Sequence, residues 1–273
     1  MQQRLHFVPP NTELRTFLLE IFCYFFALTT FSHGPSLAIT PAAQIFESLR
    51  LKDDNIQSQS LLLGPSQDLI VTIFRVSALT IHSAPRMLMD DARRSHLKGL
   101  EFQLQNWHRS VPVGNTVTSK SYEQENFDDD MVMFELYRLA CLAYVKNTLD
   151  PQVSPRNPSL QQIVASFVNE LRSLPVNSPV NGLLVWPLVV IGLCAVVSTH
   201  QRIIIGRLRV VHKTWRSDIF IHSIKSLRDR WKTYRELGEI SCSKTNNSQH
   251  TTTHETLPSS FSFQDLHFPT VLV

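Results

Sequence analysis

The chain has 273 residues, 43% of them hydrophobic, and a formal net charge of +3. This is enough for a packed core in one or two domains, and so mild a basic excess is not evidence of nucleic-acid binding. The eight glycines stand at least ten residues apart, which excludes a glycine-rich phosphate-binding loop. Scarce glycine beside long apolar segments predicts an all-α fold, an irregular array of packed helices.

No pattern of catalytic or metal-binding residues stands out. The cysteines are Cys23, Cys141, Cys194 and Cys242, and no pair has the spacing of zinc ligands. The sequence also has no G-x-S-x-G, H-E-x-x-H or C-x-x-C motif. We therefore expect no catalytic, cofactor-binding or metal-binding residue and no enzyme activity, although a helical enzyme with an unrecognised site stays open as the weakest alternative.

The first apolar segment, Thr16 to Phe31 (TFLLEIFCYFFALTTF), belongs to a helix predicted over residues 11–31. A membrane span needs about 20 apolar residues. Glu20 interrupts this segment early, and His33 to Ser36 make a poor signal-peptide cleavage site. A buried amphipathic helix is favoured. The alternative is a small membrane-anchored helical protein that uses residues 16–31 as its span.

The middle of the chain predicts four further helices. The segment QDLIVTIFRVSALTIH forms the first, after the start signal Gly64-Pro65-Ser66. Residues 90–108 form the second, because apolar residues recur there at helical spacing, namely Leu97, Leu100, Leu104 and Trp107. The third follows Asp128 to Asp130, and a linker over residues 151–158 separates it from the fourth, SLQQIVASFVNELRSL.

The three aspartates at 128–130 allow two interpretations. Acidic residues before the apolar face of Phe134, Tyr137, Cys141 and Tyr144 are compatible with a transactivation segment. We favour a structural role, in which the aspartates lie at the helix N-terminus, cap its free amides and oppose its dipole.

The most apolar stretch is the run of fifteen residues from Leu183 to Val197. Pro187 favours a helix that starts near it, because proline suits the first turn. Ser198 and Thr199 offer a break and an N-cap for the next helix. The remaining apolar run is too short to cross a bilayer. A short helix that is apolar on all sides is typical of a fully buried core element.

Residues 201–236 are the last regular part and combine an apolar face with many cations. Phe220, Ile224, Leu227, Trp231 and Tyr234 recur at spacings of four and three. Ten basic and two acidic residues between 202 and 235 leave a local excess of eight positive charges. A solvated helix face is the favoured interpretation. The alternative is a weak phosphate-contacting face made by Arg202, Arg207, Arg209, Lys213 and Arg216. Residues 241–273 lack periodicity and predict a disordered Ser/Thr-rich tail.

Several of these segments resemble the fungal-specific transcription factor domain, the C-terminal regulatory region of fungal zinc binuclear cluster transcription factors. LLVWPLVVIGLCA, from Leu183, is similar to the family's Leu-Trp-Pro-Leu…Gly…Ala segment, and an arginine-rich helix and a helix ending in tryptophan follow in both. ELYRLACLAYVKNTL, LLLGPSQDLIVTIFRVSAL and LRTFLLEIFCYFFALTTFS resemble the preceding family segments in order. The markers of the resemblance are Trp186, Pro187, Gly192 and Trp231.

The resemblance implies a regulatory domain over residues 1–240 and a nuclear regulator of transcription, controlling metabolic or biosynthetic-cluster genes. Its expected partners are proteins of the transcription machinery or another transcription factor, and a homodimer stays open as a further form of contact. The family's DNA-binding element holds two zinc ions with six closely spaced cysteines, which these four cannot supply. We therefore expect no cofactor in this chain and no membrane partner, with zinc only if a cluster lies upstream. Direct DNA binding is expected to be weak, or to need that missing N-terminal module.

The chain also departs from the family pattern inside the marker segment. Leu193-Cys194 stands where the family commonly has Cys-Glu after the glycine. The missing acid makes this helix wholly apolar and puts in doubt any polar contact that the acid makes in relatives.

Overall fold

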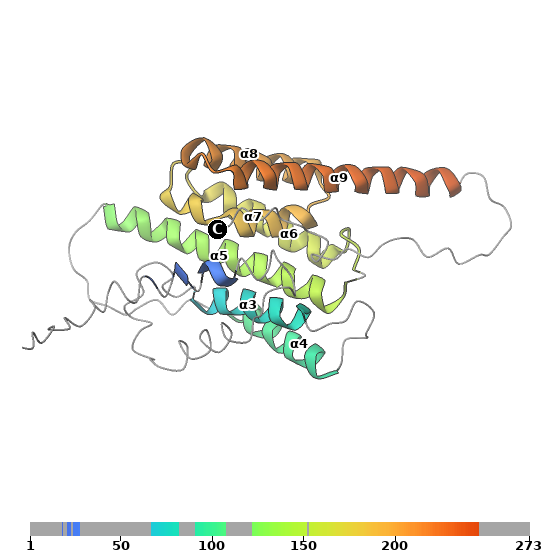
Figure 1. Cartoon of the computed structure of the whole chain (residues 1–273), viewed down its shortest axis with the longest axis horizontal. Coiled ribbons are helices and arrows are strands. Elements are labelled where there is room, and N and C mark those ends of the chain that lie inside the picture. The colour runs from blue at the N-terminus through green and yellow to red at the C-terminus, as the bar shows by residue number, and fades with distance from the viewer. Residues whose placement is uncertain are drawn as a thin grey trace, which may run out of the picture. The chain divides into compact units, whose positions relative to one another are not determined.

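The computed structural model describes residues 18, 21–22, 24–27, 67–81, 91–107, 122–151 and 153–245 (Figure 1). Over these residues the regular structure is helical, which confirms the all-α prediction. The chain divides into two compact units, residues 1–85 with 109–111 and residues 86–108 with 112–273. Most of the predicted helix over residues 11–31 and most of the predicted tail lie outside the described residues. The start of the predicted tail is different from the prediction, because residues 241–245 continue the last helix.

The first unit contains α3, Gln67–Ile81, which matches the predicted helix. Its residues 69–74 are buried. The described residues between 18 and 27 are also helical, with Tyr24 and Ala27 buried. The rings of Phe26 and Phe74 lie 5.5 Å apart, so this segment packs against α3.

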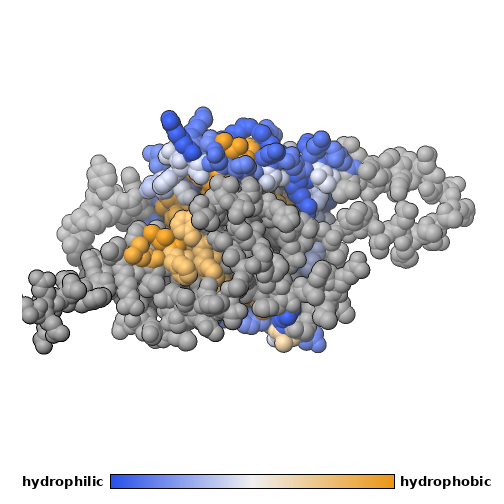
Figure 2. Space-filling view, in the orientation of Figure 1, coloured by the Kyte–Doolittle hydropathy of each residue, from blue (hydrophilic) through white to orange (hydrophobic). Residues whose placement is uncertain are grey.

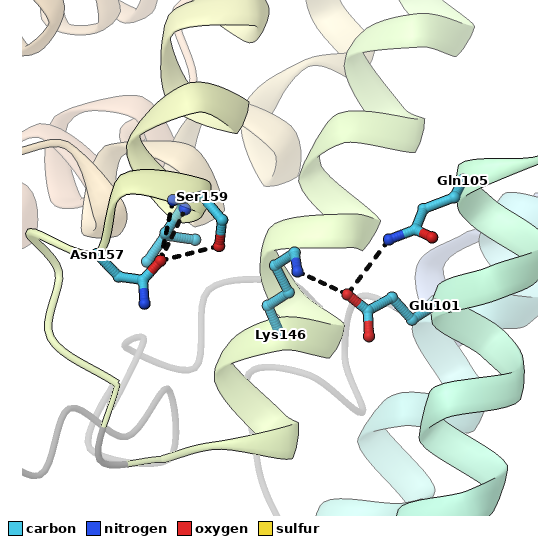
Figure 3. A network of polar contacts seen from close by, with 6 residues as sticks. Glu101, Gln105, Lys146, Asn157 and Ser159 are labelled. Atoms are coloured by element: carbon cyan, nitrogen blue, oxygen red, sulfur yellow. Dashed lines mark hydrogen bonds and ion pairs between the residues drawn. The ribbon is translucent and has the colours of Figure 1, made fainter.

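The second unit begins with α4, Asp91–Gln105, which packs against the long α5, Tyr122–Leu149. The predicted apolar face of α4 is confirmed, since Leu97, Leu100 and Leu104 are buried, and Trp107 is partly buried. At the edge of this contact an ion pair of 2.6 Å joins Glu101 to Lys146 (Figure 3). Arg138 of α5 also donates to the Leu104 carbonyl at 3.0 Å, so polar bonds link α4 to α5 at two levels.

The start of α5 differs from the prediction. The helix begins at Tyr122, so the aspartates at 128–130 lie about two turns inside it and do not cap its N-terminus. The preceding segment contains Glu123, Gln124 and Glu125, which are good helix formers and extend the helix upstream. The predicted apolar face is confirmed, because Phe134, Tyr137, Cys141 and Tyr144 are all buried.

The helix after the linker, α6, spans Pro158–Ser173 and has a complete N-terminal cap. The Asn157 side-chain oxygen accepts from the backbone amides of Ser159 and Leu160 at 3.0 and 3.4 Å (Figure 3). Pro158 occupies the first turn, where its missing N–H costs nothing. The buried face of α6 then packs along α5, which is its most extensive neighbour.

The most apolar run forms the short 3₁₀ helix η4, Pro179–Leu183, and then α7, Val185–Cys194. Every residue of α7 from Trp186 to Cys194 is buried. The helix contacts α5, α6, α8 and α9, so it is the centre of the second unit. This confirms the predicted core helix, which starts two residues before Pro187 and keeps this proline in its first turn.

The last two helices are α8, Ser198–Trp215, and α9, Asp218–Thr245, which pack against each other and against α7. Arg216 separates them in a left-handed conformation with φ 49°. The predicted cap at Ser198 or Thr199 is not formed, since Val197 is the N-cap and no side chain caps the helix. The predicted apolar face of α9 is confirmed at Phe220, Ile224, Leu227 and Trp231, and Tyr234 is partly buried.

Candidate functional site

The first marker residue, Trp186, is held in an aromatic cluster between α7 and α5. Its ring stacks on Tyr137 at 6.0 Å and meets Tyr144 edge-on at 6.1 Å. The Tyr137 hydroxyl donates to the Leu183 carbonyl at 2.5 Å. Two aromatic contacts and one hydrogen bond therefore fix the start of α7, including the buried Pro187, on the middle of α5.

The other two markers form the contact between α7 and α9. The indole N–H of Trp231 donates to the Gly192 carbonyl at 2.9 Å in the protein interior. A Cβ at Gly192 would lie only 2.8 and 2.9 Å from the two methyl carbons of Leu227. Glycine is required here because α9 approaches the α7 backbone so closely.

The four markers therefore share a structural role in the described part of the chain. Trp186, Pro187, Gly192 and Trp231 are buried or face buried atoms, and they join α5, α7 and α9. They hold the fold together and present no side chain to solvent for binding. A functional surface must be sought on the outer helices.

Arg207 differs from the other members of the predicted phosphate-contacting face. Its guanidinium donates to the carbonyls of Leu171, Leu174 and Pro175, at 2.7, 2.9 and 3.2 Å, and to the Asn181 side-chain oxygen at 3.0 Å. Loss of hydration on burial lowers the pKa of Arg207. This arginine satisfies the free carbonyls at the C-terminus of α6 and ties them to η4 and α8.

The role of Arg207 had one available signal in the sequence. It stands three residues after the buried Ile204 and four before the buried Val211, at the border of the apolar face of α8. A cation at that position is placed to reach inward. Three of its four acceptors, however, are backbone carbonyls more than 30 residues away, which no sequence pattern specifies.

A second contact lies at the end of α8. A Cβ at Gly182 would lie 2.7 Å from the Trp215 ring, so the indole rests directly on the η4 backbone. Trp215 is nevertheless 57% exposed. It covers η4 with one side of its ring and leaves the rest accessible.

The other four predicted phosphate contacts are exposed: Arg202, Arg209, Lys213 and Arg216. A second exposed row of cations runs along α9 and consists of Lys225, Arg228, Lys232 and Arg235. Figure 2 shows the outer side of α8 and α9 as mostly hydrophilic, with a small hydrophobic area within it. The structure thus places one predicted residue, Arg207, half-buried between helices and the other four on the surface.

The described cysteines do not form a reactive centre. Cys141 and Cys194 are both buried thiols. Burial raises the pKa of Cys194 to about 12, and it also raises the pKa of Cys141. Among the described residues, no group of three or more His, Cys, Asp or Glu side chains is placed to hold a metal ion.

The membrane alternative receives no support from the described helices. None of them combines the length and the apolar character that a membrane crossing requires. Most of the segment 16–31 lies outside the residues that this search covered.

Comparison with known protein families shows to which family the chain belongs. Residues 6–250 match the family model of the fungal specific transcription factor domain. The chain belongs to this family. The match spans the predicted regulatory domain and continues past residue 240, and it supports a role in transcription regulation. Within this fungal transcription factor domain, the marker residues identified from the sequence lie in α7 and α9 of the second unit.

Two further comparisons gave no match. No curated protein matches the chain significantly. No solved structure does either.

Proposed function

We propose that this fungal transcription factor domain acts in the nucleus as a regulator of metabolic or biosynthetic-cluster genes, through contacts with other proteins. The observation that carries the proposal is the family match over residues 6–250. The target genes follow from the resemblance alone, which links such domains to metabolic gene control.

The geometry fits a protein-contact module better than a catalytic one. The buried markers pack α7 against α5 and α9 and give the second unit a buried helical core. Its outer helices carry exposed cations and a few exposed large apolar side chains, including Trp215 and Ile221. Protein interfaces are enriched in tryptophan and arginine and commonly combine apolar and charged contacts.

The proposal assigns no cofactor and no enzyme activity to this chain, and its partners are proteins of the transcription machinery or another transcription factor. It also includes the possibility of a homodimer. Any direct contact with DNA by these residues would be through cations such as Arg202, Arg209, Lys213 and Arg216. Because such contacts read phosphates and not bases, the binding would be weak and would fall steeply with salt.

The proposal is tested by removing the gene from its native fungus and measuring transcripts and location. We expect a tagged wild-type protein in the nucleus and altered transcripts for a limited set of metabolic genes. Re-introduction of the wild-type gene should restore these transcripts, whereas Val190→Asp, which places a charge in the core, should not. A protein held outside the nucleus, or a transcript profile unchanged across growth conditions, would contradict the proposal.

A further inference from the structure

One face of α9 carries a continuous row of exposed side chains. Ile221, Lys225, Arg228, Lys232 and Arg235 follow one another at spacings of four and three, so they share one side of the helix. The buried residues Phe220, Ile224, Leu227 and Trp231 form a separate row that packs inward. At 1.5 Å per residue the exposed row is about 21 Å long. We call it the α9 stripe.

Within the described part of the chain the α9 stripe keeps an excess of positive charge, since its four cations lie beside three exposed acids of the same helix, Asp218, Asp229 and Glu236. No carboxylate pairs with Lys225, Arg228 or Arg235 there. Lys232 lies 3.8 Å from Glu236, and both side chains are well exposed, so water and salt screen this pair. A stripe with four cations held on one rigid helix attracts a polyanionic partner and orients it.

The first residue of the stripe distinguishes between two kinds of polyanion. Ile221 is 47% exposed although it is a large aliphatic residue. Its side chain gains nothing from a phosphate backbone, but it offers a partly formed apolar contact to a protein side chain. An exposed aliphatic residue in line with cations therefore favours an acidic polypeptide with apolar residues over nucleic acid.

We propose that the α9 stripe is a docking surface for an acidic, partly apolar polypeptide segment, whose carboxylates meet Lys225, Arg228, Lys232 and Arg235 and whose apolar side chain covers Ile221. This inference deepens the proposed function, because it names the surface and the chemistry of a protein partner. A segment that forms a helix or an extended strand along α9 can meet several cations at once.

The inference is tested by measuring peptide binding to the purified full chain with fluorescence anisotropy. The probe is a fluorescein-labelled peptide of about 15 residues, close to the length of the stripe, with glutamates and leucines on one helical face. A second peptide has lysine in place of every glutamate, and a third has serine in place of every leucine. A labelled DNA duplex of mixed sequence is the competing polyanion.

We expect the acidic apolar peptide to bind and to lose affinity as salt is raised. The lysine peptide should not bind, and the serine peptide and the DNA should bind at least about tenfold more weakly. The variant K225E/R228E should weaken binding about tenfold or more. Ile221→Ser should weaken it about fivefold, in line with an aliphatic side chain that is already half-buried.

The matched control is R94E/K98E, which reverses two exposed cations on α4 and changes the net charge equally. It should bind the peptide within about twofold of wild type. Circular dichroism verifies that each variant is folded, and K225Q/R228Q provides a milder change if the double reversal unfolds the chain. The inference is overturned by no peptide binding, by equal loss in both reversals, or by DNA binding as tight as that of the peptide.

The failure of this inference is distinguishable from the failure of the proposed function. Peptide binding is measured with purified components and does not involve transcription. A missing interaction with unchanged transcript control in cells removes only the α9 stripe as the contact surface. If the peptide binds the chain but removal of the gene leaves transcripts unchanged, the proposed function is wrong.

Discussion

Gly192→Ala tests the close contact between α7 and α9 most sharply. The new Cβ would lie 2.8 and 2.9 Å from the methyl carbons of Leu227, which is fully buried and cannot turn into solvent. Overpacking of this kind costs about 1–3 kcal/mol. Alanine in place of glycine within a helix stabilises the folded protein by about 1 kcal/mol. We expect a net loss of up to about 2 kcal/mol in the free energy of unfolding, which combines these two contributions.

The sign of this effect should reverse when its cause is removed. Leu227→Ala alone should cost about 2–5 kcal/mol because it leaves a cavity. In that background the methyl group at position 192 meets free space, so Gly192→Ala should stabilise by about 1 kcal/mol. Thermal unfolding followed by circular dichroism measures all four proteins, at about 2–4 °C per kcal/mol for a unit of this size.

Two other helical glycines serve as controls for the intrinsic preference of a helix for alanine over glycine. A Cβ at Gly99 on α4 or at Gly206 on α8 would meet no atom within 4 Å. Alanine at either position should therefore stabilise the protein by up to about 1 kcal/mol. If Gly192→Ala destabilised the protein equally with leucine and with alanine at position 227, contact with Leu227 would not be the reason for the glycine.

Two substitutions, a thiol-reactivity test and a pH series test other packed parts of the structure. Arg207→Gln should lower the free energy of unfolding by about 2–3 kcal/mol, because charged hydrogen bonds to four acceptors are lost. The exposed Lys213→Gln on the same helix should change the free energy of unfolding by less than about 0.5 kcal/mol. Equal effects would contradict the structural role of Arg207. Val190→Asp places a charge in the fully buried α7 and should give insoluble protein, so a soluble helical variant would refute the core position. Cys141 and Cys194 should stay unreactive to a disulfide reagent at about pH 8 until the protein is denatured. Because the pKa of Cys194 is raised from 9.0 to about 12, the folded state keeps a proton that the unfolded chain loses, and the stability measured by denaturant unfolding should fall as the pH rises through this range. A rise in stability over that range would contradict the burial of this thiol.

The buried parts of the fold could be predicted from local patterns. The run from Leu183 has no charged residue, so it predicts a helix with apolar contacts on all sides, which α7 confirms. The spacing of Phe220, Ile224, Leu227 and Trp231 defines one helical face, and the structure buries that face. Periodicity is reliable here because burial of a whole face dominates the packing energy of a helix.

The differences arise where structure depends on distant residues or on competing local preferences. The aspartates at 128–130 suit a helix N-terminus, but helix formers upstream of them moved the start of α5 to Tyr122. Arg207 belongs to a run of cations. It differs from Arg209 and Lys213 because it lies within hydrogen-bond distance of the carbonyls at the end of α6. Hydrogen bonds between residues far apart in the chain leave no periodic trace in the sequence.

The candidate surface could be predicted only in part from the sequence. The excess of positive charge between residues 202 and 235 could be counted, but which of those cations are half-buried and which are exposed could not be predicted. That Ile221 is exposed in line with Lys225 and Arg228 could be seen only from the packing of the helices in the structure. An isoleucine in a helical pattern is ordinarily predicted to be buried.

The central claim is that this chain regulates transcription, and a tethered reporter assay tests it most directly. The full chain is fused to a heterologous DNA-binding module and expressed with a reporter of intermediate basal activity, with or without the matching operator. We predict that reporter transcription rises or falls only when the operator is present. Unchanged transcription from the operator-bearing reporter, with the fusion protein shown by immunoprecipitation to occupy the operator, would contradict the account.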